Sequence, residues 1–155
     1  MIKLLGIGIL LAIAGYSAWI ASGRERRRLA VLEAWITLLY YVRSQIDCFS
    51  LPVAKILSSA ERSVLETLGA THAVSLEELF HASLPYLDKE SAKSLENLIA
   101  EMGSTYRQEQ VKRIDYYLRQ LETARDKMRL ELPKRVKMLV TLHLCVGIGS
   151  AILLW

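Results

Sequence analysis

The sequence predicts an all-α protein in which a cytoplasmic helical bundle, residues 24–137, lies between an N-terminal and a C-terminal transmembrane helix, residues 4–23 and 138–155. Both end segments lack charged side chains and have about the length, ~20 residues, that a helix needs to cross a bilayer. Arg and Lys residues cluster between the two segments, directly after the first and directly before the second. The middle region shows helical spacing of apolar residues and contains only Gly69 and Gly103 as glycines, a pattern that favours helices over strands.

The basic clusters predict the orientation of the chain in the membrane. Arg and Lys are enriched on the cytoplasmic flanks of membrane-spanning helices, so both clusters place the middle region in the cytoplasm and both termini outside. We also expect the clusters to attract anionic lipid headgroups, at about 1 kcal/mol per charge. The residues concerned are Arg24, Arg26, Arg27, Arg28, Lys134, Arg135 and Lys137.

A secretory signal peptide is the main alternative for the first segment. Residues 12–14 or 16–18 resemble a cleavage site of small residues. However, the apolar run continues through Trp19 and Ile20, and the arginine cluster follows at once, where exported sequences avoid positive charge. These two features favour a membrane-spanning helix.

The second segment contains Thr141 and His143 and ends on the last residue of the sequence. The alternatives there are a membrane-embedded helix that does not fully cross and a tail anchor without a signal, but a spanning helix is favoured. His143 is expected near the interface, where a neutral imidazole costs little free energy. Small residues in the two segments allow close approach of helices, either to each other or to a partner. The residues that we expect to pack in this way are Gly6, Gly8, Gly147, Gly149 and Ala151.

The first helix is expected to continue out of the membrane and to stop before Pro52. Its apolar stripe recurs every three or four residues and comprises Leu29, Leu32, Trp35, Ile36, Leu38, Leu39, Val42 and Ile46. Pro52 fits the first turn of a second helix that ends at Gly69. The apolar face of this second helix is Val53, Leu57, Val64 and Leu68.

Two further short helices are expected before the last one. Ser75 and Glu78 form a capping box, which begins a helix with Leu76, Leu79, Phe80 and Leu84 on its apolar face. Pro85 ends that helix, and the next runs from near Asp88 to Gly103.

The last cytoplasmic helix has the most regular stripe: Val111, Ile114, Leu118, Leu121, Met128 and Leu132. The pattern is interrupted by Arg125, where an apolar residue is due. The stripe is consistent with a coiled-coil dimer, but packing on the first helix within one domain is the simpler interpretation. Pro133 is expected to break or kink the chain before it enters the membrane.

The sequence contains no pattern typical of catalysis or metal binding. His72, His81 and His143 lack metal-ligand spacing with one another or with Cys48 and Cys145. No phosphate-binding loop and no nucleophile–histidine–acid pattern stand out. The positive net charge of +4 comes mainly from the residues beside the membrane segments, and no aromatic-interleaved basic motif predicts nucleic-acid binding. We expect a non-enzymatic protein without cofactor, metal, nucleic acid or small-molecule substrate.

The chain resembles the stage III sporulation protein AB family of endospore-forming bacteria. The N-terminal run Met1–Gly6, followed by the arginine cluster, carries part of this resemblance. The stretch Gln45–Pro52 stands where the family tends to have Glu-Ile, Tyr-Gly and Thr-Pro-Leu; here Cys48-Phe49 replaces Tyr-Gly and Leu51-Pro52 reverses Pro-Leu. The close is a basic-Met stretch at residues 134–138, a Gly-rich apolar run and Ile-Leu-Leu at residues 152–154.

This resemblance implies a platform subunit of a sporulation-specific, secretion-like channel complex. Family members are similar to half of the inner-membrane platform protein of type II secretion and type IV pilus machines. The implied partners are other channel subunits, including a secretion-type ATPase docked on the cytoplasmic domain, and the implied membrane is the outer forespore membrane. Exposed side chains near the two tightest turns, at Phe49 and Gly103, are the partner-contact candidates. The alternative is a freestanding membrane-tethered coiled-coil protein that self-associates.

Overall fold

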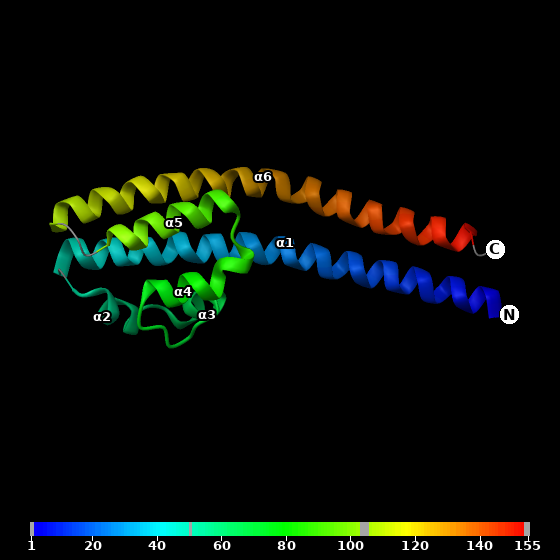
Figure 1. Ribbon diagram of the computed structural model, residues 1–155, viewed down its shortest axis with the longest axis horizontal. Helices are drawn as coiled ribbons and strands as arrows, with labels where there is room; N and C mark the ends of the chain where they lie inside the picture. The colour runs from blue at the N-terminus through cyan, green and yellow to red at the C-terminus, as the bar shows by residue number, and fades with distance from the viewer. Residues whose placement is uncertain (1, 50, 103–105, 154–155) are drawn as a thin grey trace. The chain divides into compact units, whose positions relative to one another are not determined.

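The chain folds into two compact units, the helical domain, Arg28–Lys127, and a second unit, here called the terminal unit, made of Met1–Arg27 and Met128–Trp155. The two long helices α1 (Ile2–Phe49) and α6 (Arg107–Leu153) each contribute to both units (Figure 1). The computed structural model describes the backbone of residues 2–49, 51–102 and 106–153, and the side chains of these except residues 2–11, 14, 151 and 153.

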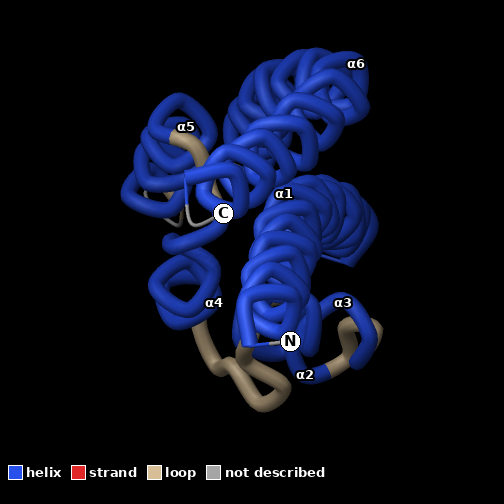
Figure 2. Tube along the Cα trace, turned by 90° about the vertical axis from the view of Figure 1, so that its right-hand side faces the viewer, coloured by secondary structure: helices blue, strands red, loops and turns tan. Residues whose placement is uncertain are grey.

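In the helical domain, short helices surround the C-terminal part of α1. They are α2 (Val53–Ser58), α3 (Arg62–Leu68), α4 (Leu76–Ser83), the 3₁₀ turn η1 (Leu84–Tyr86) and α5 (Lys89–Glu101). The view along the helices shows α2 and α3 on one side of α1, and α4 and α5 on another (Figure 2). The described part of the chain thus consists of helices and connecting loops, which confirms the prediction of an all-α fold.

The predicted stripe of α1 forms the centre of this domain. Trp35, Leu39 and Val42 are fully buried, and Leu32, Ile36, Leu38 and Ile46 are almost fully buried, while Leu29 is half-buried. Such side chains each contribute about 1.5–3 kcal/mol when they are removed from water. The three-four spacing therefore identified the buried face of α1 correctly.

The predicted second helix is wrong in one respect, because it is divided into α2 and α3. The amides of Ser59 and Ala60 donate to Ile56 and Leu57, three residues back, which tightens the end of α2. The carbonyl of Ser59 accepts a hydrogen bond of 3.3 Å from the hydroxyl of Tyr41 in α1. The chain leaves the helix at this point and starts again after Glu61, whose backbone is extended.

The predicted end of this region at Gly69 is confirmed. Gly69 has a φ of +96°, the left-handed conformation that glycine adopts without strain. Its amide donates to the carbonyl of Glu66, and the amide of Ala70 donates to that of Leu65. This pair of bonds is a Schellman motif, which satisfies carbonyl groups at the end of α3.

The predicted cap of α4 is also confirmed, and α5 begins directly after Asp88, near the predicted start. The Ser75 hydroxyl accepts from the amide of Glu78 at 3.2 Å, and one carboxylate oxygen of Asp88 accepts from the amides of Glu90 and Ser91. The Glu78 carboxylate accepts in return from the amide of Val74. One apolar position was wrongly predicted: Leu84 is exposed, because α4 ends at Ser83 and the chain enters η1 there.

The helix α6 contains both the predicted stripe and Pro133. Within the helical domain, Val111, Ile114, Leu118 and Leu121 are buried. Of the break or kink expected at Pro133, the break is wrong, since α6 runs through this residue to Leu153, and a kink stays a prediction. A proline inside a helix removes a single amide donor, and the turns on both sides can hold the helix together despite that loss.

In the terminal unit, the N-terminal part of α1 lies beside the C-terminal part of α6 (Figures 1 and 2). Ala18 and Gly147 are its buried small residues. Among the described residues, no helix has an apolar stretch that would suffice to span a membrane. The predicted spans, 4–23 and 138–155, lie partly outside the described side chains, and both remain predictions.

Candidate functional site: the surface of the terminal unit

A group of cations, here called the basic collar, lies in the terminal unit beside its apolar surface. The collar consists of Arg24, Arg26 and Arg27 on α1 and of Lys134, Arg135 and Lys137 on α6. All of these residues are exposed. Arg28, which the sequence grouped with them, belongs to the helical domain, where its Nε donates to the Tyr86 carbonyl at 3.4 Å.

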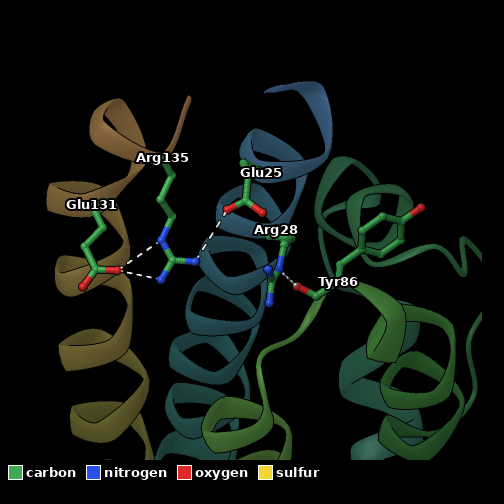
Figure 3. A network of polar contacts seen from close by, with 5 residues as sticks. All are labelled: Glu25, Arg28, Tyr86, Glu131 and Arg135. Atoms are coloured by element: carbon green, nitrogen blue, oxygen red, sulfur yellow. Dashed lines mark hydrogen bonds and ion pairs between the residues drawn. The ribbon is translucent and has the colours of Figure 1, made fainter. Parts of the chain in front are cut away.

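An ion-pair network joins the two helices of the terminal unit within the collar. The guanidinium of Arg135 lies 2.7 Å from the Glu131 carboxylate on its own helix. Its other terminal nitrogen lies 3.9 Å from the carboxylate of Glu25 on α1 (Figure 3). The Glu25 side chain is 17% exposed, so it faces α6 rather than solvent. Arg135 thereby separates two carboxylates that would otherwise repel each other.

Beside the collar, the terminal unit exposes a large apolar surface. Trp19 is 72% exposed and Ile152 is 71% exposed. A water-soluble surface rarely exposes so many large apolar side chains together, and such patches mark contact with a membrane or with another protein. The other exposed apolar residues here are Ile13, Tyr16, Ile20, Leu130, Met138, Leu142, Leu144, Val146 and Ile148.

Polar side chains within this apolar surface are bonded to their own helix. The hydroxyl groups of Ser22 and Ser150 each donate at 2.8 Å to the carbonyl four residues earlier. The Nδ1 atom of His143 lies 2.7 Å from the carbonyl oxygen of Leu139. Because a carbonyl only accepts, this contact requires the proton on Nδ1, which makes Nε2 of the neutral ring an acceptor. Local bonding of this kind lowers the cost of placing polar groups in a lipid environment.

A cavity of about 330 Å³ lies between the two helices of the terminal unit. It is mostly apolar, but the polar side chains of Ser17, His143 and Ser150 also line it. Its walls are formed by Ile13, Ser17, Leu142, His143, Val146, Gly147 and Ser150.

The small residues that were expected to pack against a helix differ in their surroundings. Gly147 is buried at the cavity, whereas no atom lies within 4 Å of the position that a Cβ would take at Gly149. Close approach of helices therefore does not require glycine at residue 149. The expected packing of Gly6, Gly8 and Ala151 lies outside the described side chains.

Two exposed aromatic side chains lie in the helical domain, one at the end of α1 and one at the beginning of α6, and Figure 1 shows these helix ends. Phe49 is 66% exposed at the end of α1, and Tyr106 is 90% exposed directly before α6. Sequence reasoning identified Phe49 but missed Tyr106, which it could have found as an aromatic residue beside a predicted turn. Gly103, the second partner-contact candidate, lies outside the described residues.

Side chains that could bind a metal ion do not cluster in the described part of the chain. There, His, Cys, Asp and Glu side chains form no group of three or more that could hold a metal ion. Cys48 and Cys145 are both exposed free thiols.

The fold and these surfaces define a helical protein whose two long helices combine an exposed apolar face with a basic collar. The family model described as stage III sporulation protein AB matches residues 3–155. The chain therefore belongs to the stage III sporulation protein AB family, and it is a sporulation-stage protein. No curated protein and no solved structure matches it.

Proposed function

We propose that this protein is a non-enzymatic membrane platform subunit of a sporulation-specific, secretion-like channel complex. In this proposal, residues 24–137 form a cytoplasmic helical domain that docks an ATPase, and both termini lie outside the membrane. The membrane is that of the bacterial cell, in particular the outer forespore membrane. Membership of the family supports the role in sporulation.

The observation that carries the proposal is the exposed apolar surface of the terminal unit beside the basic collar. Each large apolar side chain left in water forgoes about 1.5–3 kcal/mol, so a surface with many of them favours insertion into lipid. Exposed cations such as Arg26 and Lys137 favour the cytoplasmic side of the bilayer. Since the collar includes residues of both helices, both would enter the membrane from the same side.

Labelling of single cysteines tests this topology. The native thiol of Cys48 is exposed in the helical domain, and it reports on that domain in a Cys145→Ser background. Two further proteins, Lys3→Cys and Trp155→Cys in a Cys48→Ser, Cys145→Ser background, report on the termini. We expect an impermeant reagent to label both termini of intact cells, and Cys48 only after lysis. Labelling of Cys48 in intact cells would rule out a cytoplasmic domain and its ATPase contact.

The helical domain has features suited to docking a partner. Its core is fixed by long-range contacts, among them the hydrogen bond of 2.9 Å from the Trp35 indole to the Ser83 hydroxyl. On this rigid scaffold, Phe49 and Tyr106 expose large aromatic surface. Aromatic side chains are enriched among the residues that dominate binding energy at protein interfaces.

A pull-down with the full-length protein in detergent tests the docking surface. The secretion-type ATPase of the sporulation complex is the prey, and the variant Phe49→Ala, Tyr106→Ala removes both exposed rings. We expect this variant to lose at least tenfold in affinity, because an interface anchor typically contributes 2 kcal/mol or more. Leu84→Ala, which also truncates an exposed apolar residue, is the matched control. Absence of ATPase binding by the wild-type protein would contradict the docking proposal.

The alternative, self-association through a coiled coil, would use the apolar stripe of the last cytoplasmic helix. In the structure, Val111, Ile114, Leu118 and Leu121 are buried inside the helical domain. These four residues of the stripe are therefore occupied within a single chain, whereas Met128 and Leu132 are half-buried.

A further inference from the structure

One face of α1 carries aromatic, glycine and arginine residues in a single line. Tyr16, Trp19, Gly23 and Arg26 follow each other at intervals of three or four residues, so they lie on one side of the helix. All four residues are exposed, and they are called the headgroup face below. The argument rests on the proposed insertion of the terminal unit into a membrane.

The aromatic part of this face is suited to a membrane interface. The ring centroids of Tyr16 and Trp19 lie 6.2 Å apart, a distance typical of interacting aromatic pairs. Trp and Tyr gather where lipid chains meet headgroups, because their rings are apolar and their N–H or O–H group needs a polar partner. Trp19 is followed after one turn by Gly23 and after two turns by Arg26, so the face changes from aromatic to cationic within a short distance.

Gly23 leaves open space between the aromatic and the cationic part. No atom lies within 4 Å of the position that a Cβ would occupy there. The helix backbone at this point is therefore accessible to a small group that contacts Trp19 on one side and Arg26 on the other.

The charge of this face is not cancelled by the nearest carboxylate. Glu25 turns to α6, where it pairs with Arg135 (Figure 3). Arg24 is a further exposed cation in the same turn. A positive face beside Trp19 is complementary to an anionic phospholipid, whose phosphate is bound by Arg and whose glycerol region lies near the level of the Trp19 indole.

We propose that the headgroup face is a binding site for an anionic phospholipid. The phosphate lies over Gly23 and pairs with Arg26, and the indole N–H of Trp19 faces the glycerol region. The site selects anionic over zwitterionic lipid through the arginine, and it fixes the depth of α1 in the bilayer.

Lipid retention by the full-length protein tests this site. The protein is reconstituted into vesicles of phosphatidylglycerol and phosphatidylcholine in equal amounts and extracted with detergent. Bound lipid is then counted by native mass spectrometry. We expect the wild type to retain phosphatidylglycerol in preference to phosphatidylcholine. Loss of one charge in Arg26→Gln should weaken retention about fivefold, and Gly23→Leu should abolish it by filling the space over the backbone.

Two matched variants control for general effects. Arg119→Gln removes an exposed arginine of the helical domain, and Gly15→Leu adds the same side chain at another open, exposed glycine of α1. Both should retain phosphatidylglycerol like the wild type, and circular dichroism verifies that all variants are helical. Equal retention of the two lipids by the wild type overturns the site. So does equal retention of phosphatidylglycerol by Gly23→Leu and Gly15→Leu.

Alkaline carbonate extraction of cell membranes separates this inference from the proposed function. Release of the wild-type protein into the soluble fraction would overturn membrane insertion, and the headgroup face with it. A protein that stays in the membrane but shows no preference for phosphatidylglycerol would overturn the headgroup site alone.

Discussion

Arg43 of α1 and Asp115 of α6 form a two-bond ion pair within the helical domain. The Nε atom of Arg43 lies 2.6 Å from one carboxylate oxygen of Asp115, and Nη2 lies 3.1 Å from the other. The hydrogen bond to this carboxylate, followed by its charge, raises the pKa of Arg43. The pair fixes the register of the two long helices at residues that are far apart in the sequence.

The first prediction concerns this ion pair. Arg43→Gln should lower the free energy of unfolding by about 1 kcal/mol, because both side chains are about one-third exposed and solvent screens part of the attraction. Thermal unfolding of the full-length protein in detergent, followed by circular dichroism, measures the effect. Arg62→Gln removes a more exposed ion pair with Glu66 and should cost only about 0.3–0.5 kcal/mol. Equal losses for the two variants would refute a special role for Arg43.

The second prediction concerns the buried indole of Trp35. Its N–H donates to the hydroxyl of Ser83, which in turn donates to the Phe80 carbonyl, and Trp35 and Ser83 are fully buried. Ser83→Ala leaves the indole N–H without this partner and should destabilise the domain by about 1–3 kcal/mol. Urea unfolding followed by circular dichroism gives this value. Ser58→Ala is the control, because the hydroxyl of Ser58 is exposed. A loss for Ser83→Ala no larger than for Ser58→Ala would contradict the prediction.

The third prediction concerns Gly69. An ideal Cβ at this residue would lie 3.5 Å from the Cβ of Ala82, which is an ordinary contact. The cost of Gly69→Ala therefore comes from the left-handed backbone and should be about 1–2 kcal/mol. Gly15→Ala, at an open helical position, should instead be neutral or stabilising by up to about 1 kcal/mol. Comparing the melting temperatures of the two variants tests this difference in sign.

The local features of this fold could be predicted from the sequence because their causes are local. The caps at Ser75 and Asp88 depend on a side chain and amides within three residues, and the end of α3 depends on the conformational freedom of Gly69. The buried face of α1 follows from a repeat that any helix of this sequence would present.

The remaining features depend on tertiary contacts. Where the predicted second helix is divided, the Ser59 carbonyl accepts a hydrogen bond from Tyr41 of α1. The pairing of Arg43 with Asp115 requires α1 and α6 to be adjacent. The spacing of apolar residues shows which face of each helix is buried, but not which helix packs against it. At the candidate site, the collar residues could be located from the sequence. The orientation of Glu25 toward Arg135, which leaves the headgroup face positive, could not be predicted from the sequence.

The last prediction concerns the pH dependence of stability. The hydroxyl of Tyr40 donates to the Glu122 carboxylate at 2.8 Å. This hydrogen bond, followed by burial and by the charge of Glu122, raises the pKa of Tyr40. The folded state thus favours the neutral phenol. Its stabilising contribution is complete below the ordinary tyrosine pKa of about 10, and it is lost as the pH rises through the folded-state pKa.

Tyr40→Phe should therefore lower the melting temperature at neutral pH, and the difference from the wild type should shrink above about pH 10. Melting curves at several pH values, recorded by circular dichroism, measure this difference. Glu122→Gln should behave similarly, since it removes the charge that strengthens the bond. Tyr106→Phe, at a tyrosine that is 90% exposed, should leave the melting temperature unchanged at neutral pH. A constant difference between Tyr40→Phe and the wild type from neutral to alkaline pH would show that the Tyr40 hydroxyl does not titrate as its contact with Glu122 requires.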